Sequence, residues 1–114
     1  MENSRFPNFS RREGLLIAII QDADTNAVLM HGFMDSIALY RTLKTGVVHL
    51  WSTSRNRPWQ KGEESGNVMR WVKWSHDCDG DAILLRAHIE GDGLACHEKR
   101  FSCFVDFDPA TLEW

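Results

Sequence analysis

Three aspartates stand at alternate positions late in the chain, in the stretch DCDGD: Asp77, Asp79 and Asp81. On an extended backbone alternate side chains point to one face, so these carboxylates can converge on one point. Carboxylate oxygens are the ligands that hard cations such as Mg²⁺ prefer. The spacing therefore indicates a site for a hard cation, although a solvated acidic turn has the same pattern.

The same region contains all three cysteines of the chain: Cys78, Cys96 and Cys103. Zinc held by three protein ligands keeps a fourth position for water or substrate, as in catalytic sites. Thiolates and carboxylates suit metals of unlike preference, so the region indicates two metals. Two other interpretations stay open, because free cysteines are often buried as small hydrophobes and a pair of them could form a disulfide.

Residues 52–67, STSRNRPWQKGEESGN, are polar and predict a long irregular loop. The loop combines serines and glycines with three cations, Arg55, Arg57 and Lys61. Hydroxyl groups, cations and glycine-exposed backbone amides are the groups that hold phosphate in proteins. A solvated surface loop with incidental basic residues is the alternative.

Hydrophobic patterning predicts the elements that must position these groups. A helix is expected over residues 33–44, with Asp35 or Ser36 as N-cap and Gly46 as a stop signal. The predicted fold is a β-rich α+β domain over residues 1–114, with antiparallel sheets, one main helix and residues 1–13 as a loose N-terminal arm. Strands are expected at residues 15–20, 27–31, 47–51, 68–74, 82–89 and 100–107.

Composition limits the partners and the compartment. The chain has 114 residues and a net charge of −3, which argues against nucleic acid as the main partner. Its longest apolar run, residues 15–20, is too short to cross a bilayer, so no membrane association is expected. An odd number of cysteines without secretory features favours free thiols in the reducing cytoplasm.

Five stretches resemble, in order, the motifs of the phosphoribosyl-AMP cyclohydrolase family. They are QDADTNAVLMHGFM, TGVVHLWSTSR, WQKGEESGN, DCDGDAILL and ACHEKRFSCF. The resemblance runs from about residue 17 to residue 104. Four elements within these stretches, WSxSR, KGxxSGN, DCDxDxLL and CHxxxxSCF, are specific, and chance would hardly supply all four together. It implies the third step of histidine biosynthesis, in which water adds to the adenine ring of phosphoribosyl-AMP and the N1–C6 bond opens.

The resemblance also implies cofactors and an assembly. The family is homodimeric, with its zinc bound by cysteines from both subunits, so an intertwined homodimer with one zinc per subunit is expected. Carried over to this chain, the zinc ligands are Cys78, Cys96 and Cys103. The aspartates of the DCDxD motif, Asp77, Asp79 and Asp81, match the magnesium ligands.

Opening an aromatic amidine needs a strong nucleophile at neutral pH, which a zinc-activated water supplies. His97, next to a predicted zinc ligand, is the candidate general base. The substrate carries two phosphates, which gives the polar loop a role. The candidate substrate-binding residues are Ser52, Ser54, Arg55, Lys61, Ser65, Gly66 and Asn67.

Three positions depart from the family pattern. Glu64 stands where threonine is usual, Lys99 replaces a glycine and Val105 replaces a frequent tyrosine. An acid beside a phosphate site would repel the substrate, so a diverged paralogue acting on another purine nucleotide is one alternative. A non-catalytic module that zinc stabilises is the other. Stacking of nucleic acid on the five tryptophans is disfavoured by the net charge.

Overall fold

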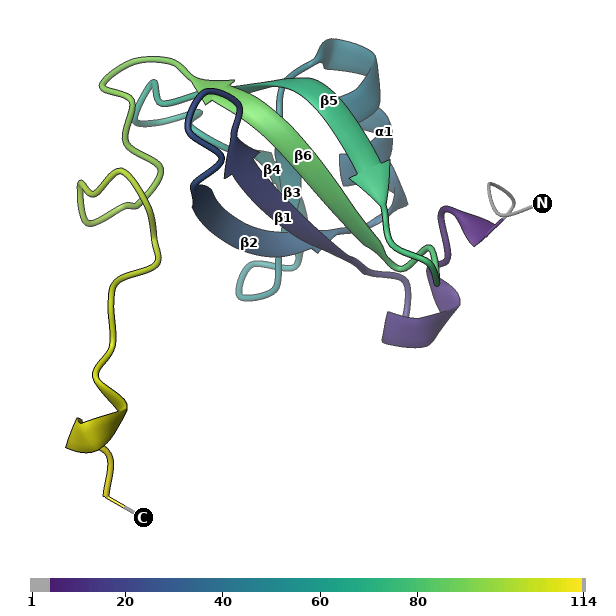
Figure 1. Ribbon diagram of the computed structural model, residues 1–114. Helices are drawn as coiled ribbons and strands as arrows, with labels where there is room; N and C mark the ends of the chain where they lie inside the picture. The colour runs from purple at the N-terminus through teal and green to yellow at the C-terminus, as the bar shows by residue number, and fades with distance from the viewer. Residues whose placement is uncertain (1–4, 114) are drawn as a thin grey trace.

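The computed structural model describes residues 5–113, which form one six-stranded sheet and one α-helix (Figure 1). The strand order is β4-β3-β2-β1-β6-β5. None of the described helices is long and apolar enough to cross a membrane. The bounds are β1 (Leu16–Asp22), β2 (Val28–Met34), α1 (Ser36–Thr45), β3 (His49–Ser52), β4 (Arg57–Gln60), β5 (Met69–His76) and β6 (Ala82–Ile89), with short 3-10 helices at Ser10–Arg12 and Pro109–Thr111.

The core lies on one face of the central strands. Every second residue of β1 is buried, from Leu16 to Asp22, and β6 buries alternate residues such as Ile83 and Leu85. Alternate side chains of a strand point to opposite faces, so these residues share one apolar side of the sheet. The predicted strand at residues 82–89 has these bounds in the structure.

The β-rich class with one main helix is confirmed, but the sheet is mixed and single. The hairpin of β1 and β2 is antiparallel, as expected, whereas β1 pairs with β6 in parallel, for example Ile19 with Leu84. The sequence predicts only antiparallel sheets. A parallel pair requires a long crossover, and local patterning does not reveal which distant strands it joins.

Helix α1 has the expected signals at both ends. The Asp35 side chain accepts a hydrogen bond of 2.8 Å from the backbone N–H of Ala38. Gly46 adopts the left-handed conformation, with φ of 80°, and its N–H donates to the carbonyl of Thr42. The helix begins at Ser36 rather than residue 33 because residues 33 and 34 still belong to β2.

The sheet is strongly curled. Strand β5 lies at one edge, yet its first residues return to the segment that leads into β3. The N–H of Val48 donates to the carbonyl of Met69 at 2.9 Å, and the N–H of Trp71 donates to that of Gly46 at 3.1 Å. The curl, seen in Figure 1, encloses the apolar face against α1.

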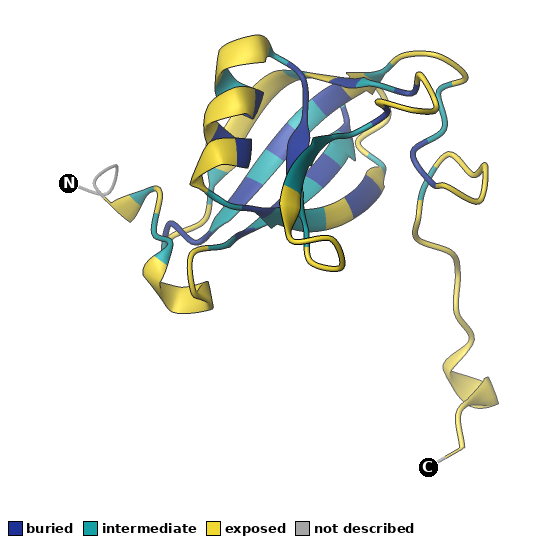
Figure 2. Cartoon of the chain, turned by 180° about the vertical axis from the view of Figure 1, so that it is seen from behind, coloured by how far each residue is buried: buried dark blue, intermediate teal, exposed yellow. Residues whose placement is uncertain are grey.

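Two expected segments differ from the structure. Strand β4 lies inside the predicted irregular loop and contains Pro58, which an edge strand accommodates because one side of its backbone has no partner. Residues 100–107, predicted as a strand, form none. Phe104, Val105 and Phe107 are exposed on a segment that leaves the body of the chain (Figure 2). Apolar residues alone do not make a strand when no partner edge adjoins them.

Candidate active site and metal ligands

A cavity of about 770 Å³ opens beside β2, β3 and the polar loop. This volume is in the usual range for a small-molecule site, about 300–1,000 Å³. Loop residues 52–55 and 61–65 line one side, and the segment around Cys96 and His97 lines another. Two regions of the chain that carry different chemistry therefore meet at one cavity.

Most of the predicted substrate-binding residues line this cavity. Gly66 does not line it; its carbonyl lies close to Gly91, where an added Cβ would come within 2.7 Å of the oxygen. The lining carries mixed charge, with the cations Arg55, Arg57, Lys61 and Lys99 and the acids Glu63, Glu64 and Asp92. The candidates that line it are Ser52, Ser54, Arg55, Lys61, Ser65 and Asn67, together with His97.

Several lining residues were missed from the sequence. His31 and Phe33 project from β2, and Trp51 and Trp59 come from β3 and β4. His31 lies within the HGFM motif. A polar residue among the apolar residues of a strand was the sequence feature that could have marked it as a site residue. The aromatic side chains give the cavity flat apolar surface of the kind on which a purine ring can stack.

Cys96 and Cys103 are neighbours at one end of the sheet. A tight turn returns residues 95–103 to β2, where the N–H of Cys103 donates to the carbonyl of Leu29 at 2.7 Å. A hydrogen bond from the N–H of Glu98 lowers the pKa of the Cys96 thiol. Burial and the adjacent Cys96 raise the pKa of Cys103. The two neighbouring thiols therefore differ in the direction of their pKa shifts, and a metal with thiolate affinity would bind both.

Cys78 lies at the other end of the sheet. It precedes β6, whereas Cys96 and Cys103 follow β6, and eight residues of strand span roughly 25 Å. Figure 1 shows these two ends on opposite sides of the body. Within residues 5–113 of a single chain, the three cysteines therefore cannot ligate one metal.

The three aspartates do converge. Each of Asp77, Asp79 and Asp81 offers a carboxylate oxygen, and these atoms lie within 4.8 Å of one another. The donor set is the one that a hard cation requires. Burial alone would raise the pKa of Asp77, but hydrogen bonds with the Asp81 side chain and from the N–H of Ala82 place it below its ordinary value.

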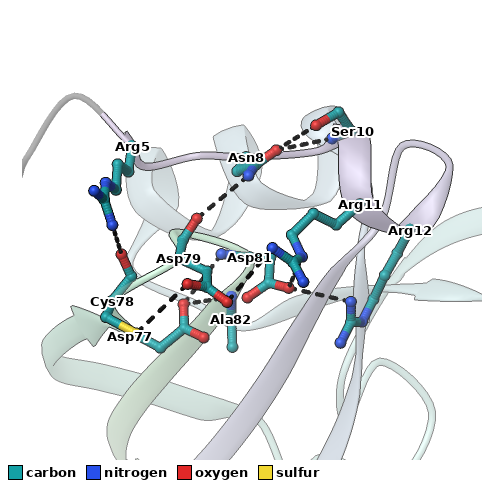
Figure 3. A network of polar contacts seen from close by, with 10 residues as sticks. All are labelled: Arg5, Asn8, Ser10, Arg11, Arg12, Asp77, Cys78, Asp79, Asp81 and Ala82. Carbon is teal, nitrogen blue, oxygen red and sulfur yellow. Dashed lines mark hydrogen bonds and ion pairs between the residues drawn. The ribbon is translucent and has the colours of Figure 1, made fainter.

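The segment before β1 covers this carboxylate turn, as Figure 3 shows. Nη1 of Arg12 lies 3.1 Å from Oδ2 of Asp81, and Nε of Arg11 lies 3.3 Å from the same oxygen. The sequence predicts a loose arm over residues 1–13. Residues 1–4 lie outside the described residues. Residues 5–12 make ion pairs and hydrogen bonds with the turn, including Asn8 N–H to the carbonyl of Gly80 at 2.7 Å.

Asn67 connects the polar loop to the segment that leads to Cys96. Its side-chain oxygen accepts a hydrogen bond of 2.7 Å from the N–H of Asp92. Gly91 permits this contact, because a Cβ there would lie 2.5 Å from that oxygen. The two sides of the cavity are thus fixed to each other through one buried amide side chain.

Comparisons with known proteins show the family of this chain. The family model for phosphoribosyl-AMP cyclohydrolase matches residues 30–105. This chain belongs to the phosphoribosyl-AMP cyclohydrolase family. The phosphoribosyl-AMP cyclohydrolase of Methanocaldococcus jannaschii is 50% identical over 102 residues, which cover 90% of this chain and 77% of that protein. The protein of the same name from Brucella abortus strain 2308 is 48% identical over 91 residues, covering 80% of this chain and 76% of its own length.

Membership of the phosphoribosyl-AMP cyclohydrolase family confirms the predicted family and the predicted class, a hydrolase of histidine biosynthesis. The structure shows the backbone conformation and position of one residue that departs from the family motifs. Lys99 stands where glycine is usual and adopts φ of 64°, a left-handed conformation that glycine adopts without steric cost. Its side chain lines the cavity, so the substitution also adds a positive charge there.

Proposed function

We propose that this chain opens the purine ring of phosphoribosyl-AMP by adding water at C6, after which the C6–N1 bond breaks and N1 takes a proton. The observation that carries the proposal is the single cavity that holds the basic, hydroxyl-rich loop on one side and Cys96 with His97 on the other. Hydrolysis of a phosphorylated purine requires both sides of this cavity. One side must bind the phosphates, and the other must activate water at the ring.

Different residues of the chain bind the phosphates and transfer the proton. Arg55 and Lys61 bind phosphate oxygens, and the hydroxyl groups of Ser52 and Ser54 complete that contact. Bound zinc would supply a water of lowered pKa next to Cys96. His97 lines the same cavity and takes the proton of that water, because it adjoins a zinc ligand in sequence and reaches the cavity.

The substrate-binding role predicts losses of affinity in single variants. Arg55→Ala and Lys61→Ala should each raise KM, by about 1.5–3 kcal/mol in binding free energy for a direct charge-assisted contact. Steady-state kinetics with phosphoribosyl-AMP measures the change. Arg41→Ala removes the same charge from the exposed face of α1, outside the cavity, and should leave KM unchanged. Unaltered KM and kcat in both loop variants would contradict the assignment.

Zinc is proposed to be held by Cys96 and Cys103 of one subunit and Cys78 of the other, in a homodimer. The distance between the two ends of β6 supports sharing, because one chain cannot bring the three thiols together. The exposed apolar side chains of Phe104, Val105 and Phe107 support a second copy as the partner, since clustered exposed apolar residues mark interfaces. Free thiols at such a site require reducing conditions, which favours the cytoplasm.

Magnesium is proposed at Asp77, Asp79 and Asp81. Their convergence and their oxygen donors support the assignment. In a shared site, Cys78 brings this turn of one subunit next to the cavity of the other. A cation held there would then lie near a substrate phosphate, and metal bridging of carboxylates and phosphates is the common mode for Mg²⁺.

One experiment tests the reaction itself. Phosphoribosyl-AMP is added to the purified, zinc-loaded protein with Mg²⁺, and ring opening is followed by ultraviolet absorbance. Turnover that stops on removing zinc with a chelator is the expected result. Turnover of another purine nucleotide in its place would favour a diverged paralogue. Stable zinc binding with no turnover of either would favour a non-catalytic module.

A further inference from the structure

The carboxylate turn already has a cationic partner within this chain. Arg11 contacts Asp79 and Asp81, with Nη1 of Arg11 3.6 Å from Oδ2 of Asp79. Arg12 contacts Asp81 as well, and the Asp81 side chain is only 6% exposed. Two guanidinium groups supply a charge of +2 to this turn, the same charge that a magnesium ion would supply.

The contact is built into the backbone and does not depend on the arginines alone. Besides the bond from Asn8 to Gly80, Nδ2 of Asn8 donates to the carbonyl of Asp79 at 3.3 Å, and Nη1 of Arg5 donates to that of Cys78 at 3.2 Å. Gly80 allows this approach, because a Cβ there would lie 2.2 Å from the carbonyl oxygen of Arg5. The segment therefore has a defined binding surface on residues 77–81.

Apolar contacts hold the same segment. The ring of Phe6 stacks on His76 with centroids 4.9 Å apart and lies 5.4 Å from the Trp74 ring centroid. Both partners are at the end of β5, directly before the aspartates. Residues 5–12 thus dock onto one turn of the sheet through these apolar contacts and through the polar contacts that Figure 3 shows.

We infer that residues 5–12 are a built-in counter-cation for the carboxylate turn, and that Arg11 and Arg12 compete with a divalent cation for Asp79 and Asp81. The inference rests on the magnesium assignment of the proposed function. Both guanidinium groups bind Oδ2 of Asp81. A dication on the same carboxylates would lie within a few ångströms of two positive charges, in a place where Asp81 is shielded from water. Either the arginines leave the turn, or the cation binds weakly.

The first test measures cation affinity. Mn²⁺, as a probe for Mg²⁺, is titrated into zinc-loaded protein while the electron paramagnetic resonance signal of free Mn²⁺ is recorded. Arg11→Gln combined with Arg12→Gln should bind Mn²⁺ about tenfold more tightly than the wild type, since the ion pairs of two guanidinium groups no longer oppose binding. Arg41→Gln combined with Lys44→Gln removes the same charge from exposed positions on α1 and should change the affinity by less than about twofold.

The second test measures whether residues 5–12 leave the carboxylate turn of the wild-type protein when Mg²⁺ binds. Mg²⁺ should speed hydrogen exchange at the Asn8 amide, which is bonded to Gly80, and leave the Gly46 amide at the end of α1 unchanged. If the wild type and the Arg11→Gln, Arg12→Gln variant bind Mn²⁺ with equal affinity, and exchange at Asn8 does not change, the competition is overturned and the metal site stands. Absence of Mn²⁺ binding in the wild type, the arginine variant and Asp79→Asn alike would overturn the carboxylate site, and the competition with it. For each of these two outcomes, turnover of phosphoribosyl-AMP is measured separately, so failure of the competition is distinguished from failure of the proposed reaction.

Discussion

Mixing the Cys78→Ala and Cys103→Ala variants is expected to restore activity that neither variant has alone. Each variant by itself should lose at least about 10²-fold in activity, because loss of a direct metal ligand exceeds the 10–100-fold typical of outer-shell partners. In the proposed dimer, Cys78 of one subunit meets Cys96 and Cys103 of the other. A mixed dimer then has one site without two ligands and one site with all three.

Random exchange of subunits should return about a quarter of the wild-type activity, because half of the dimers are mixed and each has one complete site. Activity and bound zinc are measured together after exchange. The matched control mixes Cys96→Ala with Cys103→Ala. Those two ligands come from the same chain in the proposed site, so every site stays incomplete and no activity should return. A monomeric mass for active, zinc-loaded protein would contradict the shared site.

Gly62→Ala is expected to lower the free energy of unfolding by about 3 kcal/mol, the range of backbone clashes and special-φ strain together. Gly62 has φ of 85°, and a Cβ there would lie 2.4 Å from the carbonyl carbon of Asn67 and 2.5 Å from the nitrogen of Val68. Both obstructing groups are backbone, so no side-chain rotation relieves the overlap. The change also displaces Lys61, and kcat/KM should fall with stability.

Gly66→Ala is the matched control for this variant. Gly66 has almost the same φ, 81°, but its added Cβ would meet no atom within 4 Å. It should therefore lose only about 1 kcal/mol, the cost of a left-handed conformation for a residue with a side chain. Urea denaturation of the two variants measures the difference. Equal losses would show that the close approach to Asn67 contributes nothing.

Local features of the chain were predictable, because local chemistry determines them. Asp35 and Gly46 bound α1 through hydrogen bonds to residues three and four positions away. The alternation in β1 and β6 follows from burial of one face. Strand β4 was missed since its pairing with β3, not its composition, makes it a strand. Residues 100–107 were assigned wrongly because their apolar character suits a contact surface as well as a strand.

The candidate site was predictable in its residue types and less so in its assembly. The motifs identified the thiols, the carboxylates and the cationic loop, and the loop residues do meet Cys96 and His97 at one cavity. The docking of Arg11 and Arg12 on Asp81 was not predictable, because it joins positions 69 residues apart for Arg12. Nothing in the local pattern around Arg12 indicates which acidic group it contacts.

The parallel pairing of β1 with β6 has a consequence for synthesis on the ribosome. The hairpin of β1 and β2 is complete once residue 34 has emerged, whereas β6 ends at Ile89. Until then the free edge of β1, an isoleucine-rich central strand, has no partner. Such an edge is a template for pairing with other chains. Translation speed between residues 34 and 89 therefore bears directly on the yield of folded protein, and slowing that interval should favour aggregation over the native sheet.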